Sequence, residues 1–207
     1  MIAVVDFGSG NTRSVLRALE AVGADARLVG APEGLGAAER LVLPGVGAAP
    51  SAVAELMARG LWDPVRQWGA DGRPLLGLCL GAQLLLDGSE EGDAPGMGLI
   101  AGRCRAFPPA AEGGPRQVPH IGWNEVRTAS GAFDAYFVHG YWLDADPPTV
   151  AGWTEVDGFR FPSLLRSGSL TGTQFHPEKS GPTGRALLAA FARGALDAQP
   201  VEAAAWS

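Results

Sequence analysis

The sequence predicts an α/β fold in which a mostly parallel central sheet is flanked by helices and an additional antiparallel portion follows. In the first half of the chain, three segments repeat one order: an apolar run, a glycine-containing or similarly tight turn, and apolar residues at helical spacing. Such strand–helix alternation is typical of a parallel sheet covered on both faces. After about residue 98, short strands separated by turns follow one another, which predicts the antiparallel portion.

Three strand–turn–helix units make up the first half of the chain. In the first unit, Val15, Leu16 and Leu19 recur at helical spacing after the turn. We expect the three strands at residues 2–5, 40–43 and 73–78. We expect the three helices at residues 14–20, 48–59 and 81–86.

The second half predicts six further strands and one closing helix. We expect the strands at residues 103–107, 117–126, 133–138, 150–155, 163–166 and 170–175. The final helix is expected over residues 183–193. The chain has no internal repeat and no linker rich in Pro, Gly or Ser, so we expect one domain over residues 1–193. Residues 194–207 are alanine-rich, and we expect them to form a frayed C-terminal tail.

Composition argues against several classes of protein. Of the 207 residues, 46% are hydrophobic and 18% are charged, which is typical of a globular chain and not of a disordered one. The 16 basic and 22 acidic residues give a net charge of −6 without a basic cluster, so we expect no nucleic-acid partner. The apolar runs are short, and the first residues lack the pattern of a secretory signal. We therefore expect neither membrane insertion nor secretion.

The cysteine and glycine motifs argue against a disulfide, a cofactor and a metal. Cys79 and Cys104 allow one disulfide at most, and a chain of this size folds without one, so we expect a reduced, cytoplasmic protein. Gly8-Ser-Gly10 lacks the third glycine of a dinucleotide fingerprint, and the sequence has no phosphate-binding loop with Gly-Lys-Ser or Gly-Lys-Thr. No Cys/His spacing is typical of a zinc site.

Gly77-Leu-Cys79-Leu-Gly81 is the most specific motif in the chain. A small residue two positions before and two positions after a nucleophile, between a strand and a helix, is the pattern of a nucleophile elbow. We expect the glycines to let the chain turn tightly, so that the Cys79 side chain stands above the sheet. The N-terminus of the following helix favours a thiolate. A buried structural cysteine is the alternative, but the elbow favours a nucleophile.

A cysteine nucleophile requires a base, and the chain has three histidines. His176 is the best placed, because it ends an apolar strand and Glu178 follows two residues later. That carboxylate can accept a hydrogen bond from the imidazole and fix its tautomer. We interpret His120 and His139 as structural histidines. Cys79, His176 and Glu178 are thus the candidate catalytic triad.

An acyl-transfer site also requires donors for the developing oxyanion. The N–H of Leu80, directly after the nucleophile, is one candidate. The turn Pro44-Gly-Val46-Gly47 can supply a second donor, since the ends of parallel strands converge on one edge of the sheet. The residues by themselves therefore indicate a cysteine-dependent acyl-transfer or amide-hydrolysing enzyme.

Taken together, the motifs resemble those of the class I (triad-type) glutamine amidotransferases. Gly77-Leu-Cys-Leu-Gly-Ala-Gln83 and Gln174-Phe-His-Pro-Glu178 carry this resemblance. Within the family, the chain is similar over residues 2–193 to the glutaminase subunits of imidazole glycerol phosphate synthases. The segments that favour this group are Asp6-Phe-Gly-Ser-Gly-Asn11, Pro44-Gly-Val-Gly47, Pro119-His-Ile-Gly-Trp-Asn124, Tyr136-Phe-Val-His-Gly-Tyr141 and Gln174-Phe-His-Pro-Glu-Lys-Ser180.

The resemblance implies a flavodoxin-like glutamine amidotransferase fold and a glutaminase that forms a glutamyl thioester on Cys79. It implies that Gln83 and the backbone of Gly140 and Tyr141 hold the amino-acid end of glutamine, with Gly45 also in the substrate site. It further implies a heterodimer with a (β/α)₈-barrel cyclase subunit. The cyclase uses the ammonia to make imidazole glycerol phosphate and AICAR in histidine biosynthesis.

A further set of residues is expected at the cyclase interface or along the ammonia route: Asn11, Trp123, Asn124, Tyr136 and Lys179. Lys179 is also conspicuous in the composition, because the chain has 15 arginines and this single lysine. That exception suggests a role for a compact ammonium group. Core packing is the alternative for the two aromatic residues, and a solvated surface position is the alternative for the lysine.

Three positions depart from the family pattern: Phe7 replaces a tyrosine, Thr12 replaces a leucine, and Gly140 replaces a serine or threonine. The last change removes a hydroxyl from the expected substrate site. Other functions stay open at this point. They are a glutaminase of another pathway, such as anthranilate or guanylate synthesis, a free-standing cysteine hydrolase, and a non-enzymatic binding module.

The turn Pro44-Gly-Val-Gly47 also predicts a switch. Gly45 and Gly47 accept positive φ, whereas Val46 does not, so Gly45 can absorb a rotation of the peptide that joins it to Val46. We expect the Val46 N–H to point into the site only when the partner and its nucleotide are bound. A rigid turn is the alternative.

Overall fold

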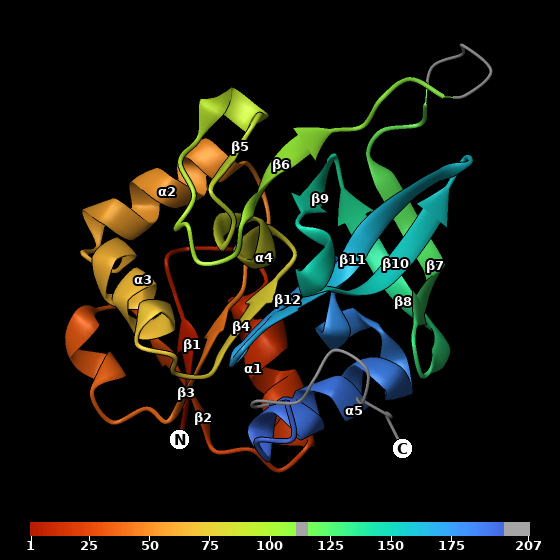
Figure 1. Ribbon diagram of the computed structural model, residues 1–207. Coiled ribbons are helices and arrows are strands. Elements are labelled where there is room, and N and C mark those ends of the chain that lie inside the picture. Colours follow the sequence, from red (N-terminus) through yellow and green to blue (C-terminus); the bar gives the residue numbers. More distant parts are fainter. Residues whose placement is uncertain (111–115, 197–207) are drawn as a thin grey trace.

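The computed structural model describes residues 1–110 and 116–196, and it confirms the α/β fold class (Figure 1). Within these residues, a nine-stranded sheet crosses the molecule and a three-stranded sheet lies beside it. The order of the large sheet is β2 (Ala26–Val29), β1 (Ile2–Val5), β3 (Arg40–Leu43), β4 (Leu75–Leu78), β12 (Leu170–Thr173), β11 (Phe159–Ser167), β10 (Val150–Val156), β7 (His120–Thr128) and β8 (Gly131–His139). The order of the small sheet is β5 (Gly88–Ser89), β6 (Gly102–Ala106) and β9 (Tyr141–Ala145).

Helices cover both faces of the parallel half of the large sheet, which consists of β2, β1, β3, β4 and β12. The helices are α1 (Thr12–Ala21), α2 (Ala49–Ala58), α3 (Trp62–Ala70), α4 (Leu80–Leu84) and α5 (Gly181–Ala192). Successive strand residues point to opposite faces. Val4 therefore packs in one apolar cluster with Leu19 of α1 and Phe191 of α5. Its neighbour Val5 packs in the other cluster, which includes Leu56 of α2.

The antiparallel portion continues the same large sheet. Strand β12 pairs in parallel with β4 and antiparallel with β11, so it joins the two halves. Strands β10, β7 and β8 then extend the sheet in antiparallel pairs. In the described residues, four short 3₁₀ helices connect other elements: η1 (Pro32–Leu35), η2 (Glu91–Asp93), η3 (Pro147–Thr149) and η4 (Pro177–Lys179).

Three strands and one α-helix of the described residues were not predicted: β2, β5, β9 and α3. Strand β2 has four residues at the sheet edge and only one of them is buried, so its apolar signal is weak. Helix α3 carries buried Trp62, Val65 and Trp68 at helical spacing, but Pro64 and Gly69 interrupt the pattern. A proline is tolerated there because it lies in the first turn. Strand β9 is identified by its pairing with β6 in the small sheet.

The C-terminal segment does not fray directly after α5. Leu196 is buried among the residues of the α1–α5 face, and its carbonyl oxygen accepts a hydrogen bond from Arg166 on β11. The rest of the predicted tail, residues 197–207, lies outside the described residues.

Four of the five parallel strands, β1, β3, β4 and β12, are followed at one edge of the sheet by segments that contain predicted site residues. The segments that follow these strands contain the glycine turn after Val5, the turn after Leu43, Cys79, and the run that begins at Gln174. Parallel pairing of neighbouring strands places all four segments at the same edge.

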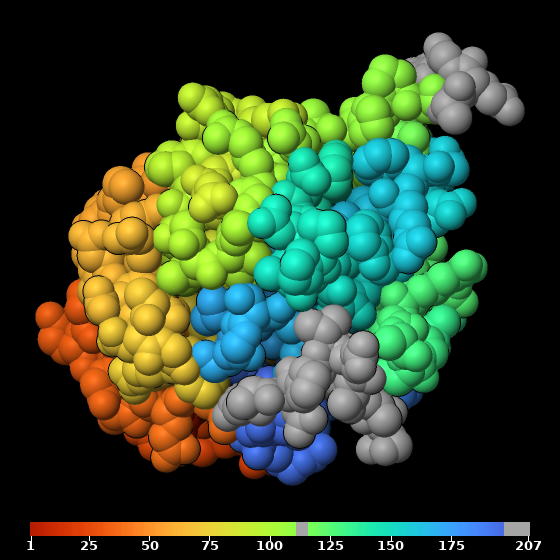
Figure 2. All heavy atoms as spheres, viewed as in Figure 1, coloured from red at the N-terminus to blue at the C-terminus, as the bar shows by residue number. Residues whose placement is uncertain are grey.

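Figure 2 shows the lime-coloured segment with β5 and β6 on the surface between the yellow helix α3 and the teal strand β9.

Candidate active site

Cys79 occupies the sharp turn between β4 and α4. Its backbone has φ 51° and ψ −107°, a strained conformation for a residue with a side chain. The two motif glycines serve close packing: a Cβ on Gly81 would lie 1.8 Å from the Leu43 carbonyl oxygen, and one on Gly77 would lie 2.8 Å from Ala82 Cα. The left-handed conformation of the turn thus belongs to Cys79 and not to the glycines on either side of it.

His176 and Glu178 form a buried hydrogen-bonded pair. The distance between His176 Nδ1 and Glu178 Oε1 is 2.8 Å. Burial disfavours the charged imidazole, but the nearby Cys79 and Glu178 outweigh it and raise the pKa of His176 to about 9. Burial also disfavours the charged carboxylate, yet the hydrogen bonds from His176 and Asn11 hold the pKa of Glu178 below its usual value. Within the described residues, His176 Nε2 makes no hydrogen bond of normal geometry, so it remains available for proton transfer.

Two groups contact the Cys79 sulfur. The carbonyl oxygen of Val138 and Nε2 of Gln174 each lie 3.7 Å from the sulfur, and the amide Nε2 is in donor position toward it. An N–H donor stabilises negative charge on the sulfur. The sequence analysis treated Gln174 only as part of a motif, because its contact joins residues 95 positions apart.

The Val46 N–H does not point into the site. It donates to Ser9 Oγ at 3.0 Å, and Ser9 Oγ donates to Asn11 Oδ1 at 3.0 Å. Asn11 Nδ2 in turn donates to Glu178 Oε1 at 3.1 Å. An N–H has a single hydrogen, so in this conformation Val46 is not available to an oxyanion. Leu80 opens α4, where the N–H groups of the first turn have no acceptor within the helix.

The glycines around Val46 have different roles. A Cβ on Gly45 would lie 2.8 Å from Leu80 Cβ, so Gly45 allows the turn to approach α4. Gly47 has φ 99°, a conformation that favours glycine. The predicted rotation changes ψ of Gly45 and φ of Val46, and neither residue has a positive φ in this conformation.

A cavity of about 350 Å³ opens beside Cys79, within the size range of small-molecule sites. Most of the residues predicted for the nucleophile, the oxyanion hole and the substrate site line it: Val46, Cys79, Leu80, Gln83, Gly140 and Tyr141. Lys179 also lines it. Gly45 is buried and lies behind the lining residues. A Cβ on Gly140 would lie 3.6 Å from Val118, an ordinary contact, so space does not require a glycine there.

The residues predicted at the cyclase interface occupy different environments. Trp123 on β7 is 59% exposed, and its ring lies 6.1 Å from that of the half-buried Tyr136 on β8. Lys179 Nζ lies 5.7 Å from the centre of the Tyr136 ring. Asn11 is only 4% exposed and contacts Glu178, so it lies in the interior beside the triad. Asn124 hydrogen-bonds within the chain and is half-buried.

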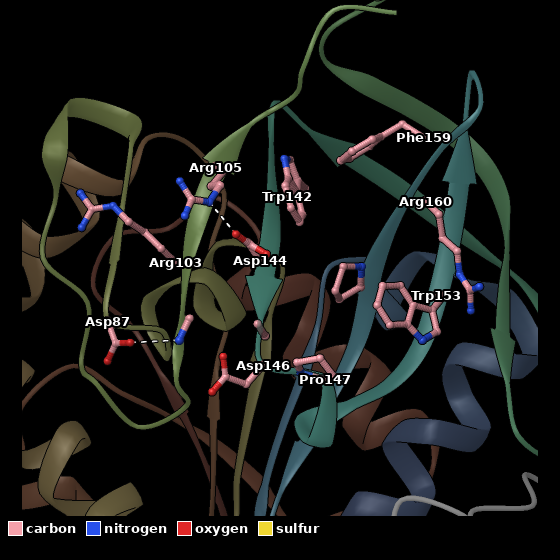
Figure 3. Close-up of a pocket in the computed structure, with 13 residues that line it drawn as sticks. Asp87, Arg103, Arg105, Trp142, Asp144, Asp146, Pro147, Trp153, Phe159 and Arg160 are labelled. Atoms are coloured by element: carbon pink, nitrogen blue, oxygen red, sulfur yellow. Dashed lines mark hydrogen bonds and ion pairs between the residues drawn. The ribbon is translucent and has the colours of Figure 1, made fainter. Parts of the chain in front are cut away.

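A second, larger cavity of about 580 Å³ lies between β6, β9 and the pair β10–β11 (Figure 3). Its arginines are already engaged: Arg105 pairs with Asp144 and Glu90, and Arg160 lies over the ring of Trp153. Among the described residues that line it, none is a cysteine, serine or histidine. The chemistry therefore belongs to the smaller cavity beside Cys79.

The His, Cys, Asp and Glu side chains in the described part of the chain form no group of three or more that could hold a metal ion. In the same residues, no helix is long and apolar enough to cross a membrane.

A strained cysteine after a parallel strand, with a buried imidazole–carboxylate pair beside it, is the arrangement of a cysteine-dependent acyl-transfer enzyme. The chain belongs to the class I glutamine amidotransferase family, whose model, "Glutamine amidotransferase class-I", matches residues 3–195. It is 47% identical over 200 residues to the imidazole glycerol phosphate synthase subunit HisH of Streptococcus sanguinis, covering 92% of this chain and 95% of that protein. It is 43% identical over 206 residues to the subunit HisH of Symbiobacterium thermophilum, covering 95% of both.

Solved structures share the fold. A crystal structure of a glutamine amidotransferase superimposes with a TM-score of 0.74 at 21% identity, covering 93% of this chain and 98% of that one. The structure of PurLQS from Thermotoga maritima superimposes with a TM-score of 0.64 at 21% identity, covering 86% and 87%.

Proposed function

We propose that the chain is the glutaminase subunit of an imidazole glycerol phosphate synthase. It hydrolyses glutamine to glutamate and ammonia, and it delivers the ammonia to a (β/α)₈-barrel cyclase subunit. The cyclase makes imidazole glycerol phosphate and AICAR in histidine biosynthesis. The observation that carries this proposal is the 47% identity to a HisH subunit over 92% of the chain. The two free cysteines agree with a reducing compartment, and we place the protein in the cytoplasm.

Catalysis begins with attack of the Cys79 thiolate on the side-chain carbonyl carbon of glutamine. The new S–C bond gives a tetrahedral oxyanion, which collapses as the C–N bond breaks. His176 donates its Nε2 proton to the departing nitrogen, so that ammonia leaves and a glutamyl thioester remains. The raised pKa of His176 keeps that proton in place at neutral pH. His176 then accepts a proton from the water that hydrolyses the thioester, and Glu178 orients the imidazole throughout.

The substrate contacts that we propose involve residues that line the cavity beside Cys79. Gln83 and the backbone of Gly140 and Tyr141 hold the amino-acid end of glutamine. The N–H groups of Val46 and Leu80 stabilise the oxyanion once the Val46 N–H has left Ser9. Gly45 supports this step by keeping the turn close to α4.

A closed route to the partner has a physical motive, because ammonia released into water is protonated and loses its nucleophilicity. The exposed apolar side chains Val118, Ile121 and Trp123 suit such a partner-facing surface, with exposures of 49%, 59% and 59%. Tyr136 and Lys179 lie between this surface and the cavity. We therefore place the ammonia route beside these two residues.

Lys179→Ala is expected to lower the affinity for the cyclase or the ratio of glutamine-dependent to ammonia-dependent synthesis. Its ammonium group lies over Tyr136 and lines the catalytic cavity, where it can pair with a group of the partner. Titration calorimetry and the two synthesis rates measure these quantities. Arg193→Ala, at the far end of α5 and exposed, is the matched control. An unchanged affinity together with an unchanged ratio would contradict the placement of Lys179 at the cyclase interface.

The proposed function is tested by measuring glutamine hydrolysis by the chain alone and together with the cyclase subunit of an imidazole glycerol phosphate synthase and its nucleotide substrate. We expect weak hydrolysis by the isolated chain and at least about a hundredfold stimulation in the complex with nucleotide. Full hydrolysis without a partner would favour a free-standing hydrolase. Stimulation by an anthranilate or guanylate synthase partner instead would favour another pathway.

A further inference from the structure

The carbonyl oxygen of Tyr141 is the centre of a buried hydrogen-bond chain. It accepts from His139 Nδ1 at 2.7 Å and from Gln83 Nε2 at 3.2 Å. A carbonyl oxygen can only accept, and these two donors occupy both of its lone pairs. His139 must therefore carry a proton on Nδ1, and Gln83 must present its NH₂ group toward the backbone of Tyr141.

At the outer end of this series of hydrogen bonds, the orientation of the Asn124 amide is fixed independently. Its Nδ2 donates to the Glu155 carbonyl oxygen at 2.9 Å, and its Oδ1 accepts from the Glu125 N–H at 2.8 Å, so the amide cannot be reversed. The second hydrogen on Nδ2 faces His120 Nε2 at 3.2 Å. His120 Nε2 is therefore an acceptor, and in a neutral ring the proton is on Nδ1.

The contacts of Tyr141 and those of Asn124 assign the same direction to the hydrogen bond between the two histidines. His120 Nδ1 lies 3.0 Å from His139 Nε2, so His120 donates and His139 accepts. Both rings are Nδ1–H tautomers with unprotonated Nε2. The two side chains are buried at 8% and 5% exposure. Burial lowers the pKa of both imidazoles, that of His139 to about 3, so a charged form is disfavoured.

Between the Tyr141 carbonyl oxygen and the nucleophile, the direction of each remaining hydrogen bond is also fixed. The second hydrogen of Gln83 Nε2 is directed at Gln174 Oε1 at 3.3 Å, which leaves the Gln174 NH₂ group to face the Cys79 sulfur at 3.7 Å. Reversal of the Gln83 amide would set its oxygen against the Tyr141 carbonyl oxygen. The Gln83 Oε1 is thus the amide group that remains for a substrate in the cavity.

We propose that His120 and His139 are positioning residues for glutamine. As a neutral Nδ1–H pair, they connect strand β7, which also carries the exposed Trp123, to the Tyr141 carbonyl and hence to the orientation of Gln83. Their action is on the binding of the amino-acid end and not on the reacting atoms. This inference rests on the proposed glutaminase function for its kinetic consequence, but the tautomers themselves do not depend on it.

The tautomers are tested by long-range ¹H–¹⁵N spectra of the ¹⁵N-labelled chain, which is tractable because the chain has three histidines. Spectra of His120→Asn assign the signals. We expect His120 and His139 to be neutral, each with a protonated Nδ1 and a bare Nε2. An Nε2–H tautomer or an imidazolium at either residue near neutral pH would overturn the inference, whether or not the protein hydrolyses glutamine.

The kinetic consequence is tested in the complex with cyclase and nucleotide. Asparagine at position 120 can still donate from the δ position, whereas leucine cannot. We expect His120→Leu to raise KM for glutamine about three- to tenfold with kcat within about twofold, and His120→Asn to restore much of the loss. A purely structural role predicts that both variants lower Tm without this division between KM and kcat, and that result would contradict the inference. If the wild-type protein shows no glutaminase activity, the proposed function fails. The tautomer spectra then still decide whether the inference about His120 and His139 is correct.

Discussion

Replacing Cys79 by serine is expected to abolish glutamine-dependent synthesis by the complex while ammonia-dependent synthesis by the cyclase continues almost unchanged. The variant cannot form the glutamyl thioester, whereas ammonia supplied in solution bypasses that step. The two rates are measured on the same complex, so that a loss of assembly can be recognised. Glutamine hydrolysis retained by Cys79→Ser would show that another residue is the nucleophile.

Cys104→Ser is the matched control for this experiment. Cys104 lies on β6, does not line the cavity beside Cys79, and is fully buried, and burial raises the pKa of its thiol and so disfavours a thiolate. We expect little change in either synthesis rate. A loss of glutamine-dependent synthesis equal to that of Cys79→Ser would contradict the assignment of Cys79 as the nucleophile.

Val46→Pro is expected to lower the partner-stimulated glutaminase rate by about 10²–10³, because proline deletes one oxyanion donor. Glutamine binding should change far less, since the donor acts on the charge that develops during the reaction. The stimulated kcat and the KM for glutamine measure the two effects, and circular dichroism checks that the variant folds. An unchanged stimulated rate in a folded variant would remove Val46 from the oxyanion hole.

Ser9→Ala is the complementary variant for the predicted switch. Ser9 Oγ holds the Val46 N–H in the isolated chain, so its removal should raise the glutaminase rate without partner by about two- to tenfold, the value of one neutral hydrogen bond. The stimulation by partner and nucleotide should fall accordingly. Equal wild-type rates with and without partner and nucleotide would mean that the turn does not act as a switch.

The fold class was predictable because it depends on local periodicity. The runs Ile2–Val5, Arg40–Leu43 and Leu75–Leu78 are fully or almost fully buried, so their apolar pattern is continuous and strong. Strand β2 at the edge has a weaker pattern, and helix α3 contains a proline and a glycine, so both were missed. A strand or helix is easy to predict from sequence where its apolar residues follow an uninterrupted pattern and its burial follows the same pattern.

The site was predictable to the extent that its residues belong to short motifs. His176 and Glu178 are two positions apart, and their 2.8 Å contact follows the spacing. Ser9 and Gln174 were missed as partners of the site because they bond to residues 37 and 95 positions away. Asn11 was predicted near the ammonia route, but its bond to Glu178, 167 positions away, places it beside the triad.

The sequence by itself determined the fold class, the family resemblance and the identity of the nucleophile, base and carboxylate as candidates, since each depends on residues that are neighbours in the chain. Only the tertiary structure decided where the hydrogens point. The Val46 N–H faces Ser9, and the polarity of the chain from Asn124 to Cys79 is set by backbone groups of distant strands. The physical reason is that the direction of a hydrogen bond depends on which donors and acceptors surround it, and folding brings those groups together from segments that no local pattern connects.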